Sequence, residues 1–141
     1  MTQLIFELER DDEWPPVAKE CLTCSDCGVG YKIQVPPLFI KDMSVGDVVS
    51  VEMNDTGDVV AWRHLSRSRQ STAWIMASPG CAIESVIECL KNLSCNVVRF
   101  EEYRYFAVDI PAEVRIEDVD ACLGAIKEGE ASFVFPSFRH E

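Results

Sequence analysis

Residues 71–138 constrain the fold of this chain most, because they read as strand, helix, strand, strand, helix and strand with few residues to spare. A first strand is expected over 72–77, and a helix over about 81–93, where apolar residues recur at helical spacing. A hairpin over 96–101 and 103–110 follows, then a helix from about 116 to 128 and a last strand over 132–138. Two right-handed crossovers would place both helices on one face of the sheet. The pattern predicts a ferredoxin-like βαββαβ half.

The preceding seventy residues carry short strand-like segments and turns without a convincing helix. Strands are expected over 4–9, 17–23 and 31–35, an extended stretch over 38–40, and a hairpin of 48–53 with 59–65. Short strands with regular turns predict a small β-barrel or a curled β-sheet. We therefore expect an α+β protein with a β-rich half over 1–70 and a ferredoxin-like half over 71–141. Both faces of the second sheet carry apolar side chains, so the halves should form one cooperative unit.

Charge is the outlier of the composition. The net charge is −11, from 24 Asp and Glu against 13 Lys and Arg, and both ends of the chain are more acidic than its middle. Such a surface repels phosphate backbones and anionic lipid, which disfavours nucleic-acid and membrane binding, and it attracts basic proteins. A surface whose charge serves solubility alone is the simpler alternative.

The sequence also predicts a cytoplasmic protein. Its first residues lack the positive charge of a signal peptide, and no segment approaches the ~20 apolar residues of a membrane span. Seven cysteines without an export signal then indicate reduced thiols.

Two groups of cysteines could carry chemistry. Cys21, Cys24 and Cys27 have the spacing of zinc ligands, but they supply three of the four ligands that structural zinc takes, so buried or incidental thiols are expected. Cys81 follows a Pro-Gly turn near a predicted helix start, where the helix dipole favours a thiolate. A nucleophile also needs a base. The sequence assigns neither His64 nor His140 to that role, so we predict no catalytic residue, metal or cofactor.

Acidic runs give the candidate binding surface. Paired carboxylates could do acid–base work or hold a hard cation, but each pair also fits a surface turn or a helix N-terminus. A tryptophan beside two prolines and an acidic run is a candidate exposed anchor for a partner. The predicted partner-binding residues are Glu9, Asp11, Asp12, Glu13, Trp14, Glu101 and Glu102.

Several short motifs carry a family resemblance: Phe6-Glu7-Leu8, Trp14-Pro15-Pro16-Val17 with Glu20, Gly30-Tyr31, Pro36-Pro37-Leu38-Phe39, Val45-Gly46-Asp47-Val48-Val49, and Ser68 with Ser71-Thr72. By these motifs the N-terminal two-thirds of the chain resembles a bacterial family known as domain of unknown function 4265. The cysteine triplet departs from the family's pattern. The resemblance supplies no activity, but it implies a small bacterial cytosolic protein, and some members of such small acidic families are immunity proteins for contact-delivered toxins.

The leading hypothesis is a non-enzymatic acidic binding protein, most simply an immunity protein that neutralises a basic, nuclease-type toxin in contact-dependent growth inhibition. The alternative is a regulatory or small-ligand-binding module, by analogy with sensing domains of similar topology. The third hypothesis is a thiol enzyme that uses Cys81.

Overall fold

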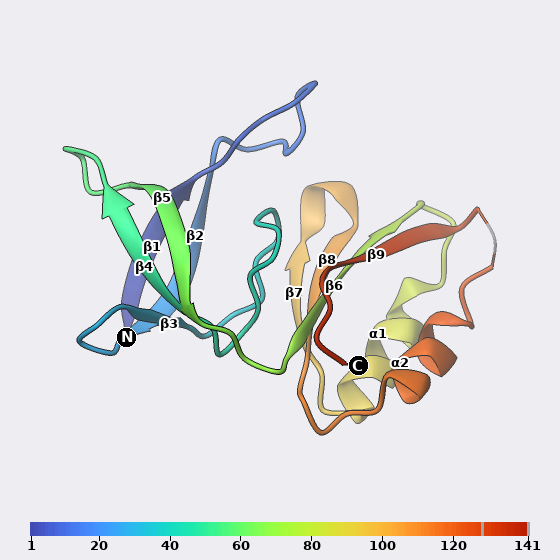
Figure 1. Ribbon diagram of the computed structural model, residues 1–141. Helices are drawn as coiled ribbons and strands as arrows, with labels where there is room; N and C mark the ends of the chain where they lie inside the picture. Colours follow the sequence, from blue (N-terminus) through green and yellow to red (C-terminus); the bar gives the residue numbers. More distant parts are fainter. Residues whose placement is uncertain (128, 141) are drawn as a thin grey trace.

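The computed structural model describes residues 1–127 and 129–140, and the side chain of Glu101 is not among the described groups. Strands β1-β2-β3-β4-β5 form a closed barrel, and a second, four-stranded sheet has the order β7-β8-β6-β9. The two β-structures lie side by side, with both helices on the face of the second sheet that points away from the barrel (Figure 1). The predicted α+β class is confirmed, and the N-terminal half is a barrel.

The barrel strands are β1 (Thr2–Glu7), β2 (Lys19–Asp26), β3 (Tyr31–Ile33), β4 (Val48–Met53) and β5 (Val59–Ser66). Alternate residues of β1 and β2 point into the barrel, which is the pattern of strands with one buried face. The predicted β4–β5 hairpin is confirmed. β2 begins later and β3 ends earlier than predicted, and residues 34–47 form one long loop in which 38–40 is not a strand.

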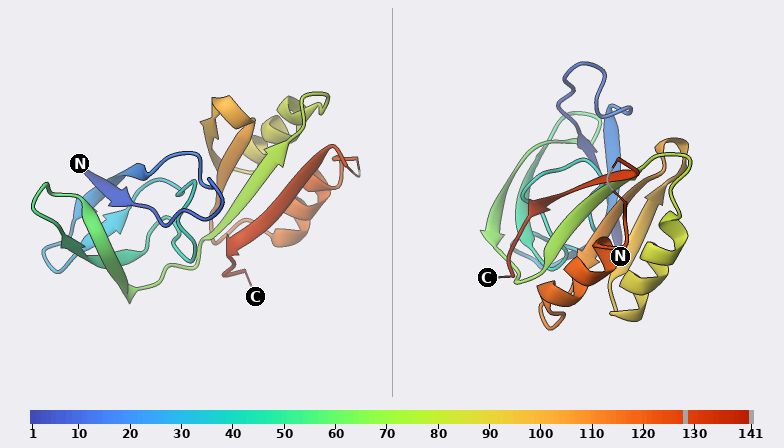
Figure 2. Two further views of the ribbon diagram at one scale, coloured as in Figure 1. Left: turned by 90° about the horizontal axis from the view of Figure 1, so that it is seen from above. Right: turned by 90° about the vertical axis from the view of Figure 1, so that its right-hand side faces the viewer.

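One residue pair closes the barrel. β1 and β5 run parallel and pair through Phe6 and Val59 alone among the described residues. Beyond that pair the chain leaves β1 for the loop that joins it to β2, and this loop extends from one end of the barrel (Figures 1 and 2). β5 continues along β4, so the two strands separate.

The second half contains the predicted elements in the predicted order: β6 (Ser71–Ala77), α1 (Ile83–Asn92), β7 (Asn96–Phe100), β8 (Tyr105–Ile110), α2 (Ile116–Leu123) and β9 (Ala131–Ser137). A 3-10 turn over Glu101–Tyr103 joins β7 to β8. α2 is shorter than predicted. Its last residue is Leu123, and Gly124 caps it, with an N–H that donates to the Asp120 carbonyl. The predicted end of this helix, residue 128, lies outside the described residues. No helix in the described part of the chain is long and apolar enough to cross a membrane.

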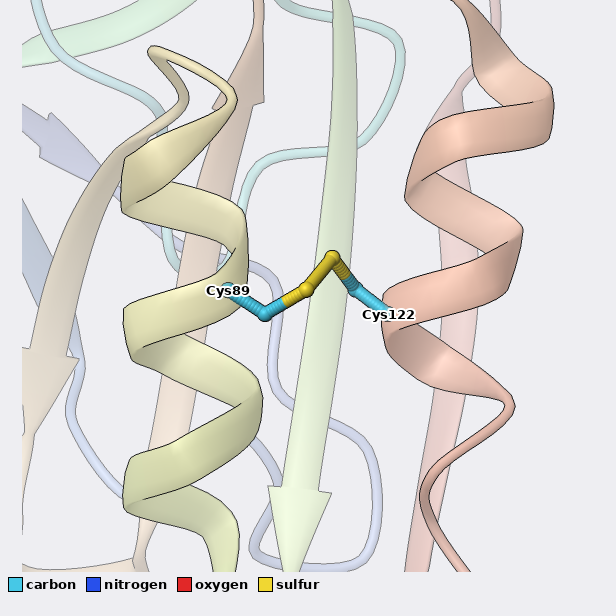
Figure 3. The surroundings of a disulfide bond; sticks show 2 residues. All are labelled: Cys89 and Cys122. Atoms are coloured by element: carbon cyan, nitrogen blue, oxygen red, sulfur yellow. A yellow bond between two sulfur atoms is a disulfide. The ribbon is translucent and has the colours of Figure 1, made fainter.

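The helices pack on one face of the second sheet through apolar side chains. Ile83, Ile87 and Leu90 of α1 and Val119 of α2 are buried against residues such as Ile75. A disulfide joins Cys89 to Cys122 between the two helices, with a Cα–Cα distance of 5.8 Å (Figure 3). The prediction that all thiols are reduced is therefore wrong for this pair. The two cysteines are 33 positions apart and meet because α1 and α2 lie side by side on the sheet.

The long loop 34–47 of the barrel half covers part of the other face of the sheet. Trp74 Nε1 donates to the Pro37 carbonyl at 2.8 Å, and the Tyr105 hydroxyl donates to the Leu38 carbonyl at 2.7 Å. The Phe39 ring stacks on Tyr105 with 5.3 Å between centroids. The other half thus covers the part of this face around Trp74 and Tyr105, whereas Met76 and Val134 on the same face remain exposed.

A buried carboxylate, that of Asp47, lies where the two halves meet. We call this contact between Asp47 and the C-terminal segment the joint. Asp47, fully buried at the end of this loop, accepts from Arg139 at 2.7 and 3.0 Å, from the Ser44 N–H at 3.0 Å and from the Ser68 N–H at 2.8 Å. His64 Nε2 lies 2.9 Å from the same carboxylate. Burial acts to raise the pKa of Asp47, but these partners outweigh it and hold the pKa below its usual value. The carboxylate therefore remains charged inside the protein.

Buried hydroxyls extend this joint. The Ser44 hydroxyl donates to that of Ser137 at 2.7 Å and lies 3.1 Å from that of Thr72. The Ser71 hydroxyl accepts from the Arg139 N–H at 2.7 Å and lies 2.6 Å from His140 Nδ1. The C-terminal segment thus bonds both halves.

Candidate partner-binding cleft

A tight turn positions Trp14 at the end of the loop that follows β1. The backbones of Asp11 and Trp14 bond each other in both directions, at 2.8 and 2.9 Å. Asp12 and Glu13 between them have φ of 50° and 67°. Two consecutive positive φ values define a type I′ turn, which glycine and asparagine favour and glutamate does not. The acidic tip is therefore held in a backbone conformation that is uncommon for glutamate.

Aromatic rings hold Trp14 against the second half. Its ring meets Phe39, Tyr103 and Tyr105 edge-on, at centroid distances of 5.7, 5.9 and 5.5 Å. Phe100 joins the group through Phe39, at 5.5 Å. Edge-to-face pairs of this kind each add about 0.5–1.5 kcal/mol beyond the burial of their area. Trp14 nevertheless remains 38% exposed. Its ring is therefore held in place by neighbours and is still accessible to a partner.

The structure brings the two predicted acidic segments together. Glu9, Asp11, Asp12 and Glu13 are all exposed on the loop that carries Trp14. Glu102 is also exposed and precedes Tyr103, whose ring contacts Trp14. The predicted residue Glu101 lies in the same turn, although its side chain is outside the described groups. That these carboxylates contact a partner stays a prediction.

A cleft of about 830 Å³ opens beside this loop, where β1 and β5 separate. Its lining comes from three parts of the barrel half and from one residue of β6: 6–11 with Trp14 and Pro15, 39–41, 59–62, and Trp74. The lining carries the carboxylates of Glu7, Glu9 and Asp11 against the cations of Arg10 and Lys41. The cleft therefore combines aromatic and apolar side chains with charged ones, of which the acidic ones are in excess, and its volume is that of a ligand site.

Glu20 is a buried carboxyl behind the aromatic group. It accepts from the backbone N–H groups of Leu38 at 2.6 Å and Phe39 at 3.0 Å. Burial raises its pKa to about 7, against the opposing effect of these two bonds. Burial, with the nearby charge of Glu20, also raises the pKa of Tyr105, which stays protonated as a donor. Glu20 thus fixes the segment that holds Phe39 against Tyr105 and Trp14.

Glu20 is not among the residues predicted from the sequence for this site. The signal was present, because Glu20 shares one face of β2 with the buried residues Leu22 and Cys24. A carboxyl on the inward face of a strand needs hydrogen-bond donors. Its position two and four residues from inward apolar side chains could have identified it.

The chain is similar to known proteins in sequence and in fold. The sequence pattern of a family described as domain of unknown function (DUF4265) matches residues 23–133. The chain belongs to this family. A search of curated proteins finds no match. A hypothetical protein from Neisseria gonorrhoeae has a similar crystal structure, with a TM-score of 0.77 and 18% sequence identity over 98% of this chain and 96% of that one. At this identity the likeness shows a shared fold.

Some of the short motifs by which the sequence resembles this family lie where the two halves meet. Asp47 and Ser68 form the buried network, and Gly46, with φ of 89°, would bring an added Cβ within 3.0 Å of the Ser68 side chain. Pro37 and Leu38 accept the bonds from the second sheet. The acidic run and Trp14 precede the matched range 23–133, so the family match does not include them.

The cysteines singled out from the sequence do not meet in the fold. Cys21 and Cys24 are three positions apart on β2, so their side chains point to opposite faces of the strand; Cys24 is buried in the barrel and Cys21 is exposed. Cys27 is exposed beyond the end of β2. Cys81 precedes α1 and is buried among apolar side chains of the second half.

Proposed function

We propose that this protein is a non-enzymatic binding protein that captures a basic protein partner at the cleft beside Trp14. One observation carries the proposal: two acidic segments from different halves lie around an exposed tryptophan whose ring contacts Tyr103. Exposed tryptophans that are held rigid are favoured anchors of protein interfaces. The net charge of −11 adds long-range attraction for a partner of opposite charge.

The proposal divides binding into two stages. Exposed carboxylates at positions 9, 11, 12 and 13 attract a basic surface and raise the association rate. Trp14 then packs into the partner and sets the lifetime of the complex, since dissociation accounts for most affinity differences between related complexes. A cationic side chain of the partner can also lie on the tryptophan ring, where a cation–π contact contributes about 0.5–2 kcal/mol.

We further propose that the partner is a bacterial toxin and that the protein acts as its immunity protein. A nuclease-type toxin needs a basic groove for its substrate, and an acidic protein competes for such a groove by charge. The histidines and the thiol that an enzyme would use are engaged elsewhere, which supports a binding role. His64 pairs with the Asp47 carboxylate, His140 bonds with the Ser71 hydroxyl, and Cys81 is only 7% exposed.

A regulatory or small-ligand module is the second candidate. The cleft favours it, because about 830 Å³ with a few polar groups is the volume and chemistry of a small-molecule pocket. We also infer that the second half is ferredoxin-like. Its order β7-β8-β6-β9, with both helices on one face, supports that inference.

Charge reversal on matched surfaces tests the proposal. Surface plasmon resonance at two salt concentrations should compare the protein with Asp11→Lys/Asp12→Lys/Glu13→Lys, using the product of the neighbouring gene as partner. Association should slow by at least tenfold and depend less on salt. The control, Glu88→Lys/Glu113→Lys/Asp120→Lys, has the same charge change at exposed positions on and near the helices.

The control should associate faster than the first variant, because its changes lie on or near the helices, which cover the opposite face of the sheet. Equal slowing of both variants would reduce the effect to net charge and contradict this site. A partner that binds but keeps its toxicity would refute the immunity role. Saturable binding of a metabolite in the cleft, without any protein partner, would favour the second candidate.

A further inference from the structure

We propose that the cleft takes an extended segment of the partner, with alternating basic and apolar residues, which pairs as an added strand with the free edge of β5. This inference rests on the proposed function and names its mode of recognition. Three observations carry it: the separation of β1 from β5, the unpaired edge that results, and the charge of the opposite wall.

The barrel leaves most of one β5 edge without a partner strand. β5 pairs with β4 along its length, but among the described residues it meets β1 only where Val59 pairs with Phe6. On the edge that faces away from β4, no strand pairing and no other backbone bond is found from Val60 onward in the described part of the chain. A strand with one partner directs alternate N–H and C=O groups away from that partner. These groups form a template for another chain.

The cleft lies along the first part of this edge, and the rest of the edge continues beyond it. Val60, Ala61 and Trp62 line the cleft on the β5 side, and residues 7–11 line it from the loop after β1. An added strand would lie about 4.8 Å from β5, and six residues beside Val60–Leu65 would span about 20 Å. Main-chain bonds of this kind supply affinity, and the pockets for alternate side chains supply selectivity.

The wall opposite β5 selects the charge of the segment. It presents the carboxylates of Glu7, Glu9 and Asp11, all on exposed residues, against one cation, Arg10, whose Nε donates to the Pro15 carbonyl, so the wall is net acidic; Lys41 lines the cleft from the loop 34–47. Alternate side chains of the added strand point to opposite faces, so basic residues can meet these carboxylates while apolar ones meet the rings of the cleft. A second copy of this chain would bring two acidic clefts together at a net charge of −11 each, which disfavours self-pairing.

The other sheet edges are less suited to such pairing. β9 is an outer strand of the second sheet, but it contains Pro136, which has no N–H to donate. β7 is an outer strand of five residues, and none of them lines the cleft. The acidic wall and the free edge therefore coincide at β5.

Peptide probes with and without backbone donors test this mode on the full chain. The probe is a six-residue peptide of alternating lysine and valine, blocked at both ends, titrated while amide signals are followed by nuclear magnetic resonance. Exchange of alternate amide hydrogens within 60–65 should slow at least tenfold when the peptide is bound. The same peptide methylated at every backbone nitrogen should bind at least tenfold more weakly, because it cannot donate to β5.

Matched variants separate charge from backbone pairing. Glu9→Gln/Asp11→Asn should weaken binding of the unmethylated peptide about tenfold, whereas Glu88→Gln/Asp120→Asn on the helices should leave it unchanged. A glutamate–valine peptide should not bind. These results together would support the added strand.

Other outcomes would overturn it. Equal binding of the methylated peptide, or unchanged β5 amides in a saturated complex, would refute strand addition. If the neighbouring gene's product still bound at the acidic surface, the proposed function would survive that result. Protection of β5 amides that rises with protein concentration and needs no peptide would instead assign this edge to self-association. Failure of every basic peptide and of the partner protein to bind would reject both proposals.

Discussion

The guanidinium of Arg139 and the carboxylate of Asp47 form a two-pronged bond across 92 positions of the chain, with Nη1–Oδ1 at 2.7 Å and Nη2–Oδ2 at 3.0 Å. Asp47 precedes β4 of the barrel, and Arg139 follows β9 of the second sheet. A bidentate arginine–carboxylate pair fixes both distance and orientation. This pair therefore sets how the two halves meet, and with them the position of the loop 34–47 beneath the aromatic group.

Removal of Arg139 should destabilise the protein strongly. Arg139→Ala leaves Asp47 buried without its cation, and breaking a buried ion pair from one side typically costs about 3–5 kcal/mol. Urea unfolding should measure this loss. The control is Arg67→Ala, which removes an exposed bond to Asp42 and should cost less than about 1 kcal/mol. Equal losses for both variants would contradict a special role for the buried pair.

Glu20 should make stability fall as pH rises from about 4.5 to 7. Burial raises its folded-state pKa to about 7, whereas the unfolded value is near 4.5, so the folded state holds the proton more tightly in this window. Deprotonation then lowers the free energy of unfolding by an amount on the order of 3 kcal/mol, reached once the pH exceeds the folded pKa.

The check is the difference in unfolding free energy between the protein and Glu20→Gln at pH 5 and pH 8. The variant has no carboxyl to titrate, so its stability should change less over this interval. Asp42 and Asp47 have lowered pKa values, and the stability that they provide is lost only as pH falls toward those values. A pH slope that is the same with and without Glu20 would show that its pKa is not raised.

Much of the fold could be predicted from the sequence, because apolar periodicity is local. The order of strands and helices from Ser71 onward follows from such spacing. The joint could not be predicted in this way, since Asp47 and Arg139 are 92 positions apart and no local pattern links the one to the other. The meeting of the two acidic segments depends on the contact between Trp14 and Tyr103, which exists only after folding. The strands and helices follow from local sequence patterns, whereas the site beside Trp14 forms only through tertiary contacts.

The two halves should unfold as one unit. The bonds from Trp74 and Tyr105 to the loop 34–47, with the buried pair at Asp47, connect them through groups that are costly to expose. Thermal unfolding should therefore give one transition by both far-ultraviolet circular dichroism and tryptophan fluorescence. Limited trypsin digestion provides a second measurement. Rapid cleavage between Arg63 and Arg69 into two folded fragments would argue against a single unit.

The Cys89–Cys122 disulfide should stabilise the second half. A cross-link between residues 33 apart restricts the unfolded chain, and native disulfides typically contribute about 2–4 kcal/mol. Melting temperature should therefore fall in reductant, and Cys89→Ser/Cys122→Ser should melt at the lower temperature with or without reductant. Other free cysteines, such as Cys95, remain in that variant as an internal control for thiol effects. An identical melting temperature in oxidising and reducing buffer would contradict this contribution.

Trp14→Ala should shorten the lifetime of the partner complex. The exposed part of the ring is the proposed anchor, and loss of a tryptophan anchor costs on the order of 2 kcal/mol or more in binding. Dissociation should speed about thirtyfold, while association, which the neighbouring carboxylates set, should change little. The matched control is Phe138→Ala, an aromatic residue 41% exposed whose ring contacts Phe135 and His140. Surface plasmon resonance with the neighbouring gene's product separates the two rates, and equal dissociation rates for the protein and Trp14→Ala would remove Trp14 from the interface.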